Sequence, residues 1–331
     1  MIEENTYWFR ISAIEQKVMK MFYLEDIKSR QLYNLNRRRC LAECYMDEEG
    51  KSITKKIIYG LHNILENIKL KMRSKSYDKV SLIDSERVPV KKYSYNKIPK
   101  TVIYTVVIGE YDELHEPFYT NDNYDFILIT DNDSMVNQNS AWKVLSLDNI
   151  EGIPKGLNSV QMNRWLKMNP SVFFSEYEVS IYIDGSVNIV TDMMPIILEF
   201  YESKSVIGMH LHSRREKILT EIRMLFYCGK INSNDKKRAV MQYQRYRKNG
   251  FDDSILLLEA TIIIRRHNDR LCKDLMHAWW NEFINGVQRD QISLPYVIWS
   301  MGVGMDDIYI LGDNEYCNPR FYISNHKKDN V

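Results

Sequence analysis

The feature that most constrains the fold is a series of four short apolar runs between residues 101 and 266. The runs are TVIYTVVIG, DFILITDND, VSIYIDGSVNI and LLEATIIIRR. Strands that are buried on both faces of a sheet have this β-branched, apolar composition. Apolar residues at helical spacing occupy residues 156–168, 193–203, 218–228, 239–248 and 269–283. The alternation of the two patterns predicts an α/β domain with a mostly parallel sheet.

The chain before residue 99 has a different pattern. Apolar residues recur at helical spacing around residues 11–22 and 57–68, which predicts two or three amphipathic helices. Residues 88–100 contain two prolines and several lysines, as a linker does. We therefore predict an N-terminal helical appendage with its linker over residues 1–98, and the α/β domain over residues 99–331.

Charge is unevenly distributed along the chain, although the net charge is only +1. Residues 51–100 carry 13 Lys and Arg against four Asp and Glu, and residues 101–200 carry four against 15. The basic segment is either a solvated helix face or a contact for anionic lipid headgroups or an acidic glycan. Because it lacks interleaved aromatic residues and lies outside the α/β domain, we predict no nucleic-acid partner.

The cysteines and the apolar runs indicate the compartment. Five cysteines are widely spread, with no CxxC pair and no zinc-type spacing, which argues against a structural zinc site and against a disulfide scaffold. The N-terminus is charged where a signal peptide needs an apolar core. The apolar runs are far shorter than the roughly 20 residues that span a bilayer. We predict a cytoplasmic protein, with peripheral contact to the inner membrane face through residues 51–100.

Acidic residues follow three of the apolar runs. Ligands of open α/β sheets bind beyond the carboxyl ends of the strands. Asp112, Asp131, Asp133 and Asp184 come after such runs, so we expect them along one edge of the sheet. An edge of this kind needs a cation to balance its charge.

The segment Asp184-Gly185-Ser186 is the sharpest local signal for chemistry. A strand that ends in Asp-x-polar presents a carboxylate and a second oxygen to one point. Mg²⁺ and Mn²⁺ use few protein oxygens, together with phosphates and water. The alternative is an ordinary strand followed by an Asp-Gly turn.

Two further groups of polar residues are candidates for the site. Arg164 and Lys167 lie three residues apart, on one face of a predicted helix, where they could hold a diphosphate or be surface charges. Arg289-Asp290-Gln291 precedes the apolar segment SLPYVIW, and its alternative role is a structural ion pair between Arg289 and Asp290.

A third group contains two histidines at alternate positions. His210 and His212 lie near Arg214, Arg215 and Glu221 in the sequence. The histidines are either metal ligands or side chains satisfied by hydrogen bonds.

The order of these features resembles a glycosyltransferase-like domain family, formerly a domain of unknown function. The family occurs in plant mucilage- and turgor-related proteins and in bacterial polysaccharide gene clusters. The resemblance covers roughly residues 101–300. The matching positions are Tyr104, Thr105, Gly109 to Leu114, Phe126, Thr130, Asp131, Trp142, Arg164, Lys167, Tyr182 to Ser186, His210, Arg214, Glu221, Gln242, Tyr246, Gly250, Arg265, Trp280 and Arg289 to Gln291.

The resemblance implies a GT-A fold, with a Rossmann-type nucleotide-binding half joined to an acceptor-binding half. It implies a nucleotide-diphosphate sugar donor, with a UDP-sugar favoured, and a Mn²⁺ or Mg²⁺ ion. The residues implied for the nucleotide sugar are Thr105, Gly109, Tyr111, Asp131, Arg164, Lys167 and Asp184. The residues implied for the metal are Asp184, Ser186 and His326. Ser186 departs from the second Asp that is usual in GT-A enzymes.

The resemblance also assigns the sugar side of the site. Asp290 resembles the Asp of an Asp-Gln pair beside the acceptor, away from the diphosphate that Asp184 serves. It would act as general base if the reaction inverts, or orient the acceptor if it retains. His210, Arg289 and Gln291 would lie on the same side.

The expected function is transfer of a sugar to a glycan or lipid-linked acceptor in surface polysaccharide biosynthesis, such as capsule or O-antigen. Two alternatives remain open at this point. One is a hydrolase of a sugar- or lipid-linked substrate that uses the Asp and His residues. The other is a catalytically inactive glycan-binding or scaffold protein, because Ser186 weakens the metal motif.

Overall fold

The computed structural model describes residues 6–9, 64, 65, 68, 91–94, 97–109, 113–213, 215–311, 315, 318 and 320–324. The chain divides into two compact units, Met1–Phe9 with Lys91–Val331, and Arg10–Val90. In the second unit, Ile64, Leu65 and Ile68 are helical and exposed. The remainder of the predicted N-terminal helices lies outside the described residues.

The first unit begins with a two-stranded pair. Strand β1 (Thr6–Phe9) is antiparallel to β2 (Lys91–Ser94). Both strands fall within the range 1–98 that the sequence assigns to the appendage. The described helices of the chain are all too short or too polar to cross a membrane.

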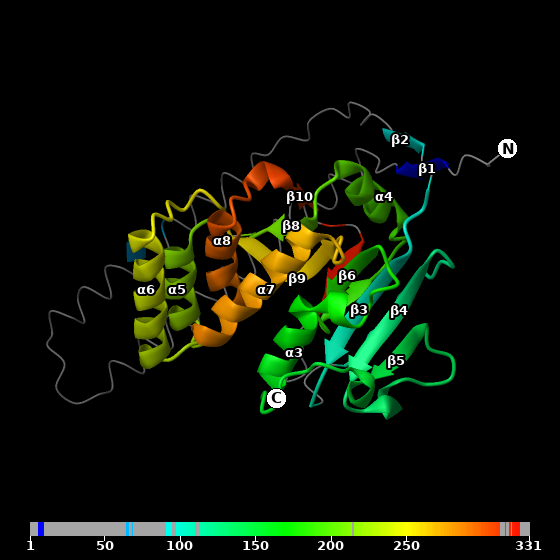
Figure 1. Cartoon of the computed structure of the whole chain (residues 1–331), viewed down its shortest axis with the longest axis horizontal. Helices are drawn as coiled ribbons and strands as arrows, with labels where there is room; N and C mark the ends of the chain where they lie inside the picture. Colours follow the sequence, from blue (N-terminus) through cyan, green and yellow to red (C-terminus); the bar gives the residue numbers. More distant parts are fainter. Residues whose placement is uncertain are drawn as a thin grey trace, which may run out of the picture. The chain divides into compact units, whose positions relative to one another are not determined.

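A seven-stranded sheet forms the centre of this unit, in the order β10-β8-β9-β6-β3-β4-β5 (Figure 1). Only β9 runs antiparallel to its neighbours in this sheet. The strands are β3 (Thr101–Val107), β4 (Tyr124–Thr130), β5 (Trp142–Ser146), β6 (Val179–Ile183), β8 (Ile207–Leu211), β9 (Leu258–Arg265) and β10 (Ile308–Ile310). The predicted α/β fold with a mostly parallel central sheet is confirmed.

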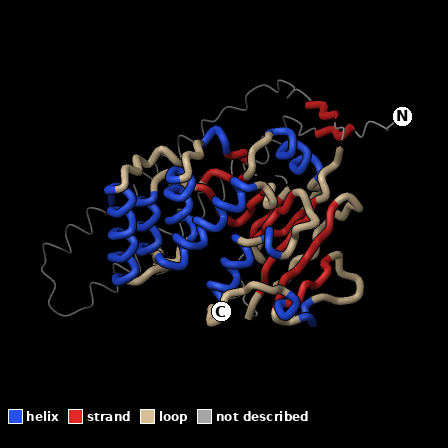
Figure 2. The backbone as a smooth tube through the Cα atoms, viewed as in Figure 1, coloured by secondary structure: helices blue, strands red, loops and turns tan. Residues whose placement is uncertain are grey.

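Side chains of the central strands enter two apolar clusters, one on each face of the sheet. In β3, Tyr104 belongs to one cluster and Ile103 to the other, because successive side chains of a strand point to opposite faces. Figure 2 shows the helices beside the sheet. The cluster on the first face also takes in side chains of α3 (Ser159–Met168), α5 (Ile218–Tyr227), α6 (Ser233–Lys248), α7 (Arg270–Asn285) and α8 (Asp290–Ser300). The second is covered by α4 (Met194–Ser203) and by the pair β7 (Val187–Ile189) and β11 (Phe321–Ile323).

The five helices predicted from apolar spacing are present as α3 to α7. Side chains cap the starts of three of them: Asn158 and Gln161 form a capping box at α3, Asn232 caps α6 and Asp269 caps α7. Helix α8 was not predicted. Its continuous apolar run contains Pro295, and a run without helical spacing cannot be told from a strand.

The parallel neighbours β6, β3 and β4 end at the same edge of the sheet. Asp184 directly follows β6 and Asp131 directly follows β4. The prediction is therefore confirmed for these two carboxylates. Asp133 lies two residues beyond Asp131, at the start of a short 3-10 helix (Asp133–Met135), and Asp112 lies outside the described residues. This edge is where the candidate site is found.

Candidate functional site

Two carboxylates and two cations meet at this edge. The Lys167 Nζ atom is 3.0 Å from Asp290 Oδ2 and 3.7 Å from Asp184 Oδ1. The Arg164 Nε atom is 3.1 Å from the same Asp290 oxygen. The Lys167 side chain is fully buried, whereas that of Arg164 is 26% exposed. We call these four residues the charge cluster.

Asp184 is held by the turn that follows β6. Its backbone N–H donates to the Thr261 carbonyl at 2.8 Å, and its carbonyl accepts from the Val187 N–H at 2.9 Å. The Tyr182 hydroxyl donates to Asp184 Oδ1 at 2.6 Å. Burial, followed by the charge of Asp184, raises the pKa of Tyr182 well above its usual value. The tyrosine is therefore a permanent donor to the carboxylate.

Asp290 begins α8, and its carbonyl accepts from Trp279 Nε1 and from the Ser293 hydroxyl, each at 3.1 Å. Burial acts to raise the pKa of Asp290, but the charges of Lys167 and Arg164 outweigh it and hold this pKa far below its usual range. The carboxyl group is therefore ionised and weakly basic in this state.

The position of Asp290 differs from the expectation in two respects. It is not set apart from Asp184, because both carboxylates contact Lys167. It is also not paired with Arg289, which donates instead to the Lys230 carbonyl. The separation failed as a prediction because α7 packs against α3 and α8 packs against α7, a long-range arrangement that residue spacing does not reveal.

A second polar network starts at Gln291. Its Nε2 atom donates to Glu259 Oε2 at 2.6 Å, and the other Glu259 oxygen lies 3.2 Å from His212 Nδ1. His212 Nε2 lies 2.8 Å from an Arg215 nitrogen and 3.4 Å from Glu221 Oε2, and Arg215 pairs with Glu221. Of the predicted cluster, the structure brings together His212, Arg215 and Glu221, whereas His210 contacts Asn318 instead and Arg214 lies outside the described residues. Glu259 was missed.

Glu259 lies within the apolar run of β9, and a single acid among apolar residues was its only sequence signal. Burial and the neighbouring carboxylate of Glu315 raise the pKa of Glu259 to about 8. Burial of Glu221 acts to raise its pKa, but hydrogen bonding to His212 and the charge of Arg215 lower it overall. The two buried glutamates on either side of His212 therefore favour different charge states near neutrality.

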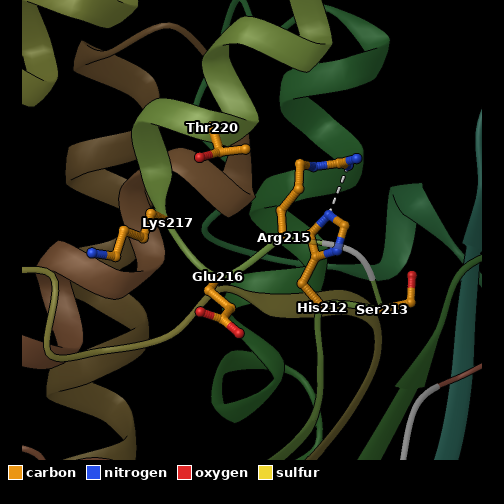
Figure 3. Close-up of a pocket in the computed structure, with 6 residues that line it drawn as sticks. All are labelled: His212, Ser213, Arg215, Glu216, Lys217 and Thr220. Atoms are coloured by element: carbon orange, nitrogen blue, oxygen red, sulfur yellow. Dashed lines mark hydrogen bonds between the residues drawn. The ribbon is translucent and has the colours of Figure 1, made fainter. Parts of the chain in front are cut away.

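A pocket of about 430 Å³ opens beside this network. Figure 3 shows the hydrogen bond between Arg215 and His212 at its wall. Its lining is entirely polar: His212, Ser213, Arg215, Glu216, Lys217 and Thr220. The Ser213 N–H also approaches Glu259 Oε1 at 3.4 Å, so the pocket wall contacts the residue that holds Gln291.

The predicted nucleoside side is built around Gly109. Its φ of +66° is in the left-handed region, which glycine adopts without strain. The Gly109 N–H donates to both carboxylate oxygens of Asp131, at 3.2 and 3.1 Å. Thr105 is buried inside β3, and Tyr111 lies outside the described residues. The structure thus brings Gly109 and Asp131 together at the open edge.

Two further predicted residues, His210 and Ser186, lie in the interior. His210 is fully buried, with its Nε2 atom 3.1 Å from Asn318 Nδ2. Burial, and then the charge of Arg320, lower the pKa of His210 to about 3, so the ring is neutral. Ser186 is 4% exposed, and His326 lies outside the described residues.

Among the residues that the structure describes, no three His, Cys, Asp or Glu side chains lie together as a metal site. The residues present nevertheless fit a metal ion that is coordinated mainly by the phosphates of a bound substrate. Mg²⁺ commonly binds through one or two carboxylates together with substrate phosphates. The Asp184 carboxylate, with a side chain 20% exposed, supplies one such group.

A family model described as "TOD1/MUCI70, glycosyltransferase-like domain" matches residues 85–318. The chain belongs to this family. The family resemblance read from the sequence is confirmed, and the TOD1/MUCI70 domain of this chain is a glycosyltransferase domain. No curated protein sequence matches the chain.

Solved glycosyltransferase structures resemble the TOD1/MUCI70 domain at low identity. The WbbM bifunctional glycosyltransferase is 8% identical with a TM-score of 0.42, over 75% of this chain and 45% of WbbM. Mouse xyloside xylosyltransferase 1 is 10% identical with a TM-score of 0.39, over 64% and 84% of the two chains. The S. cerevisiae mannosyltransferase Ktr4p is 10% identical with a TM-score of 0.34, over 65% and 69%.

Proposed function

We propose that this domain transfers a sugar from a nucleotide-diphosphate sugar, with UDP as the favoured nucleotide, to a glycan or lipid-linked acceptor of surface polysaccharide. The observation that carries the proposal is the charge cluster at the carboxyl edge of the sheet. Arg164 offers a partly exposed cation, and Asp184 and Asp290 lie on either side of Lys167. Departure of a diphosphate requires cations that stabilise its negative charge, and attack by a hydroxyl requires a carboxylate that orients it. The charge cluster holds both at one point.

The diphosphate is proposed to bind between Arg164 and Asp184. Arg164 suits phosphate because its planar guanidinium donates two parallel hydrogen bonds. On metal binding, the single carboxylate of Asp184 would share Mn²⁺ or Mg²⁺ with the phosphate oxygens. Such an ion neutralises charge on the departing group. Gly109 and Asp131 would receive the nucleoside at the neighbouring strand ends.

Asp290 is proposed to orient the acceptor hydroxyl and to stabilise the oxocarbenium-like state of the sugar. A general base works best when its pKa lies near the working pH. The strongly lowered pKa of Asp290 therefore favours a charged, orienting role over proton abstraction. As the bond from the acceptor oxygen to the sugar forms, its proton would pass to an oxygen of the departing diphosphate.

The acceptor is proposed to occupy the pocket shown in Figure 3. Its polar lining suits a hydroxyl-rich glycan, and Glu259 joins its wall to Gln291, next to Asp290. Thr220 is exposed on α5, so Thr220→Trp should fill the pocket without disturbing the core. That variant should raise the KM for acceptor and leave donor affinity unchanged, and an unchanged acceptor KM would remove the pocket from the proposal.

Peripheral contact with an anionic membrane, at its cytoplasmic face, completes the proposal. Its support is the excess of Lys and Arg in residues 51–100 and the exposed apolar side chains of Ile64, Leu65 and Ile68 on a helix. The five cysteines are widely spread and form no CxxC pair, which suits a reducing compartment. Sedimentation with phosphatidylserine vesicles should capture the protein, and phosphatidylcholine vesicles should not.

The proposed activity is tested by thermal shift with UDP, GDP, CDP and their sugars, with and without Mn²⁺. A ligand at 100 times its Kd stabilises the fold by about 2.7 kcal/mol. At least one nucleotide should raise the melting temperature. The absence of any shift across the panel would contradict nucleotide-sugar binding.

A further inference from the structure

Lys167 is buried and already paired with carboxylates, whereas a ligand-binding lysine needs an ammonium that a ligand can reach. Its side chain is fully buried. The ammonium lies 4.9 Å from the centroid of the Tyr182 ring, and it contacts Asp290 and Asp184 at 3.0 and 3.7 Å. A diphosphate could reach this ammonium only by displacing a carboxylate.

The backbone of Lys167 is fixed as firmly as its side chain. Its carbonyl accepts from Arg265 Nη1 at 2.6 Å and from the Tyr104 hydroxyl at 3.1 Å. A second Arg265 nitrogen donates to the Tyr104 hydroxyl at 2.6 Å. Arg265 is fully buried, and among the described residues no carboxylate pairs with it.

A buried guanidinium at this place has a specific partner, the last turn of α3. Unpaired carbonyls and the negative end of the helix dipole gather at a helix C-terminus, where cations are favoured. Arg265 thereby fixes the end of α3 from inside the domain. From this fixed backbone position, the Lys167 ammonium contacts the two carboxylates of Asp184 and Asp290.

We propose that Lys167 is a positioning residue, which holds Asp184 and Asp290 at one point of the site and does not bind the diphosphate. The proposal rests on the glycosyltransferase function proposed above and assigns ligand contact to Arg164 instead. Without the lysine charge, the two carboxylates would repel each other, and the pKa of Asp290 would rise. The effect should therefore appear in transfer and its pH dependence more than in nucleotide affinity.

The test compares Lys167→Met with Arg164→Met by calorimetric titration with UDP and by steady-state transfer from pH 5 to 8. We expect Lys167→Met to keep the UDP Kd within about threefold while kcat falls at least about 10²-fold, the range of a positioned acid–base group. On the acid side of the pH profile, the activity of Lys167→Met should begin to fall at a higher pH than that of the wild type. Arg164→Met should weaken UDP binding at least about tenfold, the effect of about 1.4 kcal/mol.

A double variant covers the case in which unpaired carboxylates impair folding. In Lys167→Met/Asp290→Asn the excess buried charge is removed, so its melting temperature should exceed that of Lys167→Met. The loss of kcat from Asp290→Asn should also be much smaller in the Lys167→Met background than in the wild type. Additive losses, or a UDP affinity in Lys167→Met as weak as in Arg164→Met, would overturn the positioning role. Failure of the wild type to bind any nucleotide would instead overturn the function on which it rests.

Discussion

Lys167 Nζ lies 3.0 Å from Asp290 Oδ2, although 123 residues separate the two in the sequence. The contact joins the end of α3 to the start of α8. It places Asp290 beside Asp184 and sets its charge, because the lysine is the first of two cations that lower the pKa of this carboxyl group against the effect of burial. The charge cluster is therefore one unit, and changes at its members should not act independently.

Asp290→Asn preserves the size of the side chain and removes its charge. We expect near-normal donor affinity and transfer slowed at least about 10²-fold, because an amide orients a hydroxyl without stabilising positive charge. Turnover and donor Kd measured on one preparation check this. Asp306→Asn, at an exposed aspartate, is the matched control, and full transfer activity in Asp290→Asn would remove this carboxylate from the mechanism.

Asp184→Ala should abolish any dependence of nucleotide binding on Mn²⁺. Ser186→Asp adds the carboxylate usual in GT-A enzymes, but at a position only 4% exposed. A buried carboxylate without a partner is unfavourable, so this variant should melt lower without metal. Thermal shifts should then show a larger gain with Mn²⁺ and nucleotide than in the wild type. Normal metal-dependent binding by Asp184→Ala would show that the metal is held elsewhere.

Gly109→Ala should destabilise the loop that follows β3. The left-handed φ of +66° costs a residue with a Cβ about 1–2 kcal/mol, and the Gly109 N–H would shift from Asp131. Urea unfolding and UDP titration should show lower stability together with weaker binding. Gly304→Ala serves as control, since Gly304 has a φ of −97°; equal losses in the two variants would contradict the role of the turn.

The free energy of unfolding should fall as the pH rises from about 7 to 8. Below this range the buried His210 and His267, whose pKa values are lowered to about 3 and about 4, have the opposite effect, because the unfolded chain protonates them and the folded state does not. Folding raises the pKa of Glu259 from an ordinary value of about 4.3 to about 8, so the folded state keeps a proton that the unfolded chain releases. The part of the free energy of unfolding that this Glu259 proton contributes is fully present below about pH 4.3. It is lost progressively up to pH 8, by at most about 1.4 kcal/mol per pH unit. Urea unfolding at several pH values measures the slope.

Glu259→Gln should flatten this dependence. His212, Glu221, Arg215 and Glu315 lie around the same carboxyl group. The slope that remains should come from His210 and His267, whose pKa values burial lowers to about 3 and about 4. Glu176→Gln, at an exposed glutamate, should keep the full slope. The same slope in all three proteins would show that Glu259 is ionised throughout.

The strands and most helices could be predicted because each is signalled within a few residues. Runs such as the one that forms β3 are apolar on both faces, and α3 carries both its spacing and its capping box. The placement of Asp184 and Asp131 at one edge followed from the parallel direction of their strands alone. Helix α8 was missed because its apolar run contains Pro295 and lacks helical spacing.

Contacts between distant segments account for what could not be predicted. The partners of Asp290 depend on how α7 packs against α3 and how α8 packs against α7, and no local pattern encodes that packing. Glu259 was missed because one acid in an apolar strand is indistinguishable from an exposed edge residue until its neighbours are known. The burial of His210 has the same cause, since Asn318 covers it from more than 100 residues away.

The most direct test of the central claim is nucleoside diphosphate release from a panel of UDP-, GDP- and CDP-sugars, compared in the wild type, Asp184→Ala and Asp290→Asn. The charge cluster predicts release by the wild type with at least one donor and loss of release at least about 10²-fold in both variants. Release of product from a sugar- or lipid-linked substrate without any nucleotide donor, or equal release by all three proteins, would contradict glycosyl transfer at this cluster.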